Sequence, residues 1–108
     1  MKKRVIKNLL LMGGLACTAP ALFAAGPSGA MLAGTCAACH GTNGSSVGYI
    51  PSLAGGTAEY FVDSMKAFKY GDRDATVMDR VAKGYSDEQI ASMGEFFSKQ
   101  KLKPMKQK

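Results

Sequence analysis

The chain has 108 residues with a formal net charge of +6 at pH 7, and 46% of its residues are hydrophobic. This length is enough for one small domain, whose hydrophobic core alone would give only marginal stability. Four positive charges (Lys2, Lys3, Arg4 and Lys7) precede an apolar run, and removing them from +6 leaves +2, so the charge gives no reason to expect nucleic acid as a partner.

The first 24 residues have the layout of a secretory signal peptide. The basic start is followed by a largely apolar run over residues 5–23 and by small residues from Ala24 onward. We expect cleavage after Ala24, which leaves one domain over residues 25–108. A retained membrane anchor is less favoured, because Gly14 and Pro20 interrupt an apolar run that is already short for a span of about 20 residues. The mature form is therefore expected to have no membrane span.

The first predicted helix ends in a motif that carries the chemistry of the chain. Ser28 can cap the start of this helix, and Leu32, Cys36 and Cys39 fall on one face. His40, the only histidine, directly follows the second cysteine, and the spacing Cys-x-x-Cys-His is typical of covalent c-type haem attachment. One helical turn separates the thiols by a distance that matches the two porphyrin vinyl groups, and His40 is then the proximal iron ligand.

Three other interpretations of the cysteine pair are less favoured: a thioredoxin-like redox motif, half of a zinc site, and a structural disulfide. No βαβ pattern surrounds Cys36 and Cys39. A tetrahedral zinc site needs a fourth ligand, and the remaining Cys17 lies in the predicted signal peptide. Export to an oxidising compartment, the bacterial periplasm, fits haem attachment to these thiols.

A glycine-rich loop over residues 41–56 separates the motif from the next helix. The second predicted helix starts near Thr57, carries Phe61, Met65 and Phe68 at core spacing and stops at Gly71. A third, short helix is predicted to be capped by Asp74 and to stop at Gly84.

The last predicted helix has the clearest signals. Ser86 and Gln89 can form a capping box, and Ile90, Met93 and Phe97 form an apolar stripe. A basic tail begins at about residue 103. No stretch has the pattern of a strand, so the sequence predicts an all-α domain packed around one covalently attached haem.

The identity of the distal iron ligand can be narrowed by elimination. Because there is no second histidine, a methionine, a lysine amine or an open site remains. The methionines after the predicted signal peptide are Met31, Met65, Met78, Met93 and Met105. Met78 is the best placed, because it lies at a short helix after polar, turn-forming residues and the chain there is long enough to reach the distal side. Its alternative role is ordinary core packing.

Three segments resemble class I cytochrome c: Cys36-Ala37-Ala38-Cys39-His40-Gly41, Pro51-Ser52-Leu53-Ala54-Gly55 and Ala82-Lys83-Gly84-Tyr85-Ser86-Asp87. The resemblance covers nearly all of the chain after the predicted signal peptide. Residues 76–86, the pair Phe68-Lys69 and the Phe96-Phe97 ending are more narrowly similar to the cytochrome subunit of flavocytochrome c sulfide dehydrogenase.

The resemblance implies a class I cytochrome c fold and roles for two further residues. In the cytochrome subunits of flavocytochrome c sulfide dehydrogenase, the methionine matching Met78 is the distal ligand. The carbonyl matching Pro51 accepts a hydrogen bond from the ring nitrogen of His40 that does not bind iron. Asp79 departs from the family pattern, in which glycine is more frequent at this position. A single Cys-x-x-Cys-His motif allows one haem c.

Iron with both axial positions filled leaves no place for substrate, so we expect a domain that passes single electrons and is not an enzyme by itself. The resemblance implies a subunit of a flavoprotein sulfide dehydrogenase that accepts electrons from FAD and passes them to a soluble redox carrier. The alternative is a freely diffusing cytochrome c that serves a terminal oxidase or reductase; a haem protein with an open distal site is less favoured. Two haem propionates bring the mature charge near zero, which favours the subunit, because diffusing carriers often rely on a charged patch.

Overall fold

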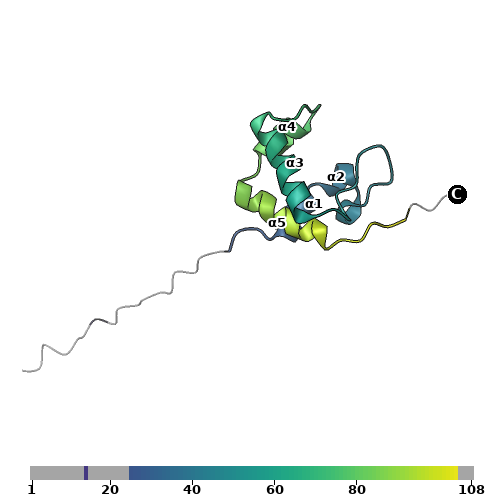
Figure 1. Ribbon diagram of the computed structural model, residues 1–108. Helices are drawn as coiled ribbons and strands as arrows, with labels where there is room; N and C mark the ends of the chain where they lie inside the picture. Colours follow the sequence, from purple (N-terminus) through teal and green to yellow (C-terminus); the bar gives the residue numbers. More distant parts are fainter. Residues whose placement is uncertain (1–13, 15–24, 105–108) are drawn as a thin grey trace, which may run out of the picture.

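The computed structural model describes residue 14 and residues 25–104 (Figure 1). Apart from Gly14, the predicted signal peptide lies outside the described residues, as do Cys17 and Met105. The elements in chain order are α1 (Gly29–Gly34), α2 (Ala37–His40), the 3-10 helix η1 (Thr42–Gly44), α3 (Ala58–Tyr70), α4 (Met78–Lys83) and α5 (Asp87–Ser98). The described residues contain no strand, and the all-α prediction is confirmed. Within the same residues, none of the helices combines the length and the hydropathy needed to cross a membrane.

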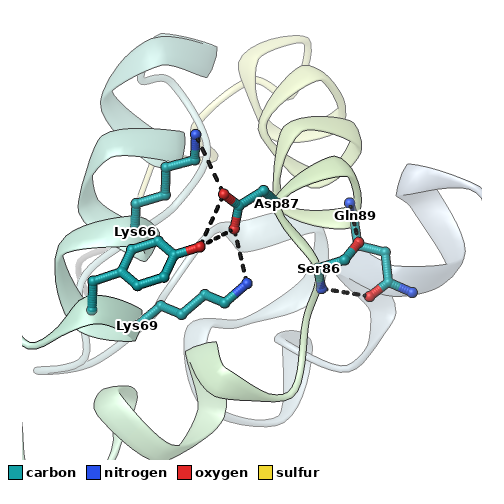
Figure 2. Close-up of polar contacts among 6 residues, drawn as sticks. Lys66, Lys69, Ser86, Asp87 and Gln89 are labelled. Carbon is teal, nitrogen blue, oxygen red and sulfur yellow. Dashed lines mark hydrogen bonds and ion pairs between the residues drawn. The ribbon is translucent and has the colours of Figure 1, made fainter.

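Both ends of α3 and the start of α5 lie at the predicted signals. Thr57 accepts a hydrogen bond from the backbone N–H of Tyr60 at 3.1 Å, and α3 ends at Gly71, which has a left-handed φ of 86°. At the start of α5, Ser86 Oγ accepts from the Gln89 N–H at 3.1 Å and Gln89 Oε1 accepts from the Ser86 N–H at 2.9 Å (Figure 2). This is the predicted capping box.

The first predicted helix is broken into two. Thr35 and Cys36 form a turn between α1 and α2, in which the Thr35 hydroxyl donates to the Leu32 carbonyl at 2.7 Å and the Cys36 N–H donates to the Ala33 carbonyl at 3.0 Å. A threonine hydroxyl that bonds to the backbone competes with the helical ladder, which explains the break. The expectation of one continuous helix through the attachment motif is therefore wrong, and the motif starts its own short helix.

The start of α4 is also later than predicted. Val77 is its N-cap and no side chain caps it, so the prediction that Asp74 caps this helix is wrong. Thr76 and Val77 are β-branched and lose side-chain freedom in a helix. The non-helical chain over residues 74–77 leads directly to Met78, the first residue of α4.

The core lies where α5 packs against α1 and α3 (Figure 1). Ile90, Met93 and Phe97 of α5 are almost fully buried, and the rings of Phe97 and Phe61 lie 5.2 Å apart. α1 approaches α5 so closely that a Cβ at Gly29 would lie 2.2 Å from the Ser92 carbonyl oxygen. Only glycine allows this approach, and it holds α1 against the core.

A polar cluster joins the C-terminal end of α3 to the first residue of α5 (Figure 2). Lys69 Nζ lies 2.8 Å from Asp87 Oδ1, and Lys66 Nζ lies 3.8 Å from Asp87 Oδ2. The Tyr70 hydroxyl donates to both Asp87 oxygens, at 2.9 and 3.1 Å. The hydrogen bonds from Lys69 and Tyr70 hold the pKa of Asp87 below its usual value.

Candidate haem-binding site

A cavity of about 570 Å³ lies between α2, α3, α4 and the loop before α3. Its volume is within the range of about 300–1,000 Å³ that small-molecule and cofactor sites occupy. Most of its wall is apolar, and its apolar lining includes Ile50, Leu53, Phe61, Met65, Phe68, Val77, Met78 and Val81. Such a lining suits a large, flat, apolar ligand.

The structure brings the whole predicted attachment motif to this cavity. Cys36, Cys39 and His40 all line it. Cys36 is the N-cap of α2, and His40, the last residue of that helix, is buried with 8% of its surface exposed. No disulfide joins Cys36 and Cys39. Two thiols and an imidazole from one helical turn, beside an apolar cavity, fit a covalently attached haem.

The surroundings of Cys36 argue against a redox thiol pair. Burial raises the pKa of the Cys36 thiol, and the nearby Thr35 hydroxyl opposes this only in part. Catalytic redox cysteines have a lowered pKa, because the thiolate is the reactive form. Within residues 25–104, no group of three or more His, Cys, Asp or Glu side chains is arranged to hold a metal ion.

The imidazole of His40 has a partner in the loop that follows it. Its Nδ1 lies 2.6 Å from the carbonyl oxygen of Pro51. A carbonyl can only accept, so Nδ1 carries the proton and Nε2 keeps the lone pair that can bind a metal. The loop is held in place by the Gly44 carbonyl, which accepts from the Leu53 N–H at 2.8 Å, and by Ser52 Oγ, which accepts from the Ser46 N–H at 2.9 Å.

Two of the methionines in residues 25–104 line the cavity. Met78 does so from the first residue of α4, where it is partly buried. Met65 belongs to the buried core, as predicted, but its side chain also lines the cavity, which the helical spacing did not indicate. Met93 is fully buried in the core outside the cavity lining, and Met31 is 70% exposed. The geometry therefore leaves Met78 and Met65 as the described methionines that face the site.

Several cavity residues carry no sequence signal for a site. Among the described residues, Arg73 is the one charged side chain that lines the cavity. Its guanidinium lies over the Phe68 ring at 4.6 Å and donates to Ser64 Oγ at 3.4 Å. Thr35 and Tyr85 also line it, from two distant parts of the chain. These contacts arise from the tertiary fold, so neither periodicity nor motif spacing could identify them.

Asp79 follows Met78 directly and has an unusual environment. Its Oδ1 is buried and has no hydrogen-bond partner among the described residues. An unpaired buried carboxylate oxygen costs stability, because it loses water without a replacement.

Comparison with known proteins identifies the family. A family model described as cytochrome c matches residues 27–103, which include every element of the fold. The chain belongs to the cytochrome c family. Cytochromes c attach haem c covalently and transfer electrons, so the cofactor is haem c and the protein is an electron carrier.

Three curated relatives of this cytochrome c are informative. The cytochrome subunit of sulfide dehydrogenase from Chlorobaculum tepidum is 46% identical over 69 residues, which cover 64% of this chain and 63% of the relative. Cytochrome c-554(548) from Halomonas halodenitrificans is 44% identical over 71 residues, or 62% of this chain and 86% of the relative. The thiosulfate dehydrogenase electron acceptor from Thiomonas intermedia is 38% identical over 104 residues, or 94% of this chain and 45% of the relative. The chain therefore spans less than two thirds of the length of the first and third relatives.

Proposed function

We propose that this cytochrome c is a periplasmic monohaem protein that serves as the electron-transfer subunit of a flavoprotein sulfide dehydrogenase, accepting electrons from FAD and passing them to a soluble carrier. The observation that carries the proposal is the 46% identity over 69 residues to a protein named as the cytochrome subunit of sulfide dehydrogenase. The similarity of residues 76–86 to that family supports it.

In this proposal Cys36 and Cys39 would hold the haem through thioether bonds, and His40 and Met78 would bind its iron. When bound, the haem iron supplies one-electron chemistry by changing between its ferric and ferrous forms. His40 and Met78 together leave no axial position for substrate. The chain is then an electron-transfer subunit rather than the catalytic one.

Pro51 tunes the proximal ligand. Its carbonyl, 2.6 Å from His40 Nδ1, fixes the orientation of the imidazole and increases the donor strength of Nε2. A methionine sulfur as the second ligand raises the reduction potential. The apolar cavity wall favours the form of the iron with the lower charge, because a low-dielectric environment disfavours charge.

The predicted signal peptide over residues 1–24 supports the periplasmic assignment. A leader of this layout exports the chain to an oxidising compartment, where the two thiols are joined to the cofactor rather than left to pair with each other. The mature protein then begins near Ala25.

A freely diffusing cytochrome c is the second candidate function. One observation favours it: the similarity to cytochrome c-554(548) covers 86% of that relative, compared with 63% of the sulfide dehydrogenase subunit. A carrier of this kind would pass electrons to a terminal oxidase or reductase.

Size-exclusion chromatography of native periplasmic extract at high salt separates the two candidates. Transient redox partners bury less than about 1,200 Å² in total, and their charge attraction is screened by salt. A resident subunit stays bound. Co-elution of this haem with a flavin spectrum, and its flavin-dependent reduction by sulfide, would support the subunit. Elution as a lone domain would contradict it and favour the diffusing carrier.

A pair of valine substitutions sharpens the test. Val81 is 42% exposed at the cavity, whereas Val47 is 87% exposed and does not line it. Electron transfer requires the flavoprotein to approach the haem, so Val81→Lys should weaken the complex and Val47→Lys should not. Equal effects of the two variants would contradict docking at the cavity.

A further inference from the structure

A hydrogen bond between residues 50 positions apart spans one edge of the cavity. The hydroxyl oxygens of Tyr85 and Thr35 lie 2.5 Å apart, and both residues line the cavity. The Thr35 hydroxyl has a single proton, which it donates to the Leu32 carbonyl at 2.7 Å. Tyr85 is therefore the donor in the bond to Thr35.

The two ends of this bond belong to the two segments proposed to carry iron ligands and attachment points. Thr35 directly precedes Cys36 in the turn before α2, and its backbone N–H also donates to the Leu32 carbonyl, at 3.2 Å. Tyr85 directly follows the C-cap of α4, and its backbone N–H donates to the Ala82 carbonyl of that helix at 3.2 Å. Tyr85 therefore moves with α4, which begins at Met78.

Few other polar contacts hold α4 in place. Within residues 74–85, the bond from Tyr85 is the one side-chain hydrogen bond to another part of the described chain, and no ion pair involves these residues. Of the six residues of α4 only Ala82 is buried, and the N-cap Val77 offers no side-chain bond. The position of α4 depends on apolar packing against α3 and on this one bond.

We propose that Tyr85 is a positioning residue. Its hydrogen bond to Thr35 holds α4 against the turn that precedes α2 and so restrains the departure of Met78 from the iron. The inference rests on the proposed function, because it takes Met78 as the distal ligand. Tyr85 touches neither the iron nor Met78 in this account; it acts by holding the helix that begins with Met78.

The size of the effect follows from the strength of one neutral hydrogen bond. A net contribution of this kind changes an equilibrium constant about fivefold. Tyr85→Phe keeps the ring and removes only the donor. We expect the open form, in which Met78 is off the iron, to become about fivefold more populated.

Cyanide binding to the ferric protein measures this opening. At saturating cyanide the rate of binding is limited by the departure of the distal ligand. The limiting rate therefore measures how fast Met78 leaves the iron, which the Tyr85–Thr35 bond is proposed to slow. Tyr85→Phe should raise the limiting rate about fivefold while the sulfur-to-iron charge-transfer band remains. Tyr70→Phe is the matched control: it removes a tyrosine donor that bonds to Asp87 outside the cavity lining, and should leave the limiting rate unchanged.

A double-mutant cycle tests whether Thr35 is the acceptor. Thr35→Ser keeps the hydroxyl and should behave like the unsubstituted protein, whereas Thr35→Val should raise the limiting rate. Adding Tyr85→Phe to Thr35→Val should have no further effect. The proposed role of Tyr85 would be overturned by an unchanged limiting rate in Tyr85→Phe. It would also be overturned if Tyr85→Phe raised the rate equally in the unsubstituted protein and in Thr35→Val. In both cases the assignment of Met78 as ligand would stand. Absence of the charge-transfer band in the unsubstituted protein would overturn both the assignment of Met78 as iron ligand and the proposed role of Tyr85.

Discussion

Substitution of Gly29 by alanine tests the close approach of α1 to α5. The added Cβ would lie 2.2 Å from the Ser92 carbonyl oxygen and 2.7 Å from its carbon. Both atoms belong to the backbone of α5, so one helix must move. Overpacking of this kind costs up to about 3 kcal/mol, and the higher helix propensity of alanine returns up to about 1 kcal/mol. The net loss of about 2 kcal/mol corresponds to a fall in Tm of about 8–16 °C for a domain of this size.

Thermal unfolding of the haem-loaded protein, followed by circular dichroism, measures this loss. Gly34→Ala is the matched control in the same helix, because no atom lies within 4 Å of the position of its Cβ. It should leave Tm unchanged or raise it slightly. If Gly29→Ala were as stable as Gly34→Ala, the packing of α1 against α5 would differ from that described.

Three further predictions concern charge and attachment. The lowered pKa of Asp87 contributes stability that is present above about pH 3.9 and is lost as pH falls through the folded-state pKa. Asp87→Asn should therefore lower Tm at neutral pH and make Tm fall less steeply in acid. An equal dependence of Tm on acid pH in the two proteins would contradict this. The Oδ1 of Asp79 is buried and has no hydrogen-bond partner among the described residues, and Asp79→Asn removes the charge of this carboxylate, so the substitution should raise Tm. A lower Tm would contradict this and indicate that Oδ1 accepts a hydrogen bond. Intact mass of the periplasmic protein should show one haem and a start near Ala25; a retained leader, or one haem still bound covalently after substitution of both Cys36 and Cys39 by alanine, would contradict the assignment.

The parts of the fold that could be predicted from sequence are those with local causes. Both ends of α3 and the start of α5 follow from Thr57, Gly71 and the capping box at Ser86, because each cap is satisfied within a few residues. The attachment motif is equally local, since one helical turn sets the spacing of its thiols.

The parts that could not be predicted depend on tertiary contacts. The break before α2 is fixed by the Thr35 hydroxyl, whose second partner, Tyr85, is 50 residues away. The late start of α4 has a local cause in the β-branched side chains of Thr76 and Val77, but the sequence gives no sign that both residues line the cavity. Helical spacing correctly placed Met65 in the core but gave no sign that it also lines the cavity.

The optical spectrum of methionine variants tests the proposed haem site most directly. Met78, Met65 and Met93 differ in position but not in chemistry: Met78 begins α4 at the cavity, Met65 lines the cavity from the core, and Met93 is buried in the core outside the cavity lining. The ferric protein should show a sulfur-to-iron charge-transfer band. Met78→Ala should abolish the band and open the iron to carbon monoxide in the ferrous state, whereas Met65→Leu and Met93→Leu should keep it. Loss of the band in Met65→Leu or Met93→Leu, with its retention in Met78→Ala, would contradict the account.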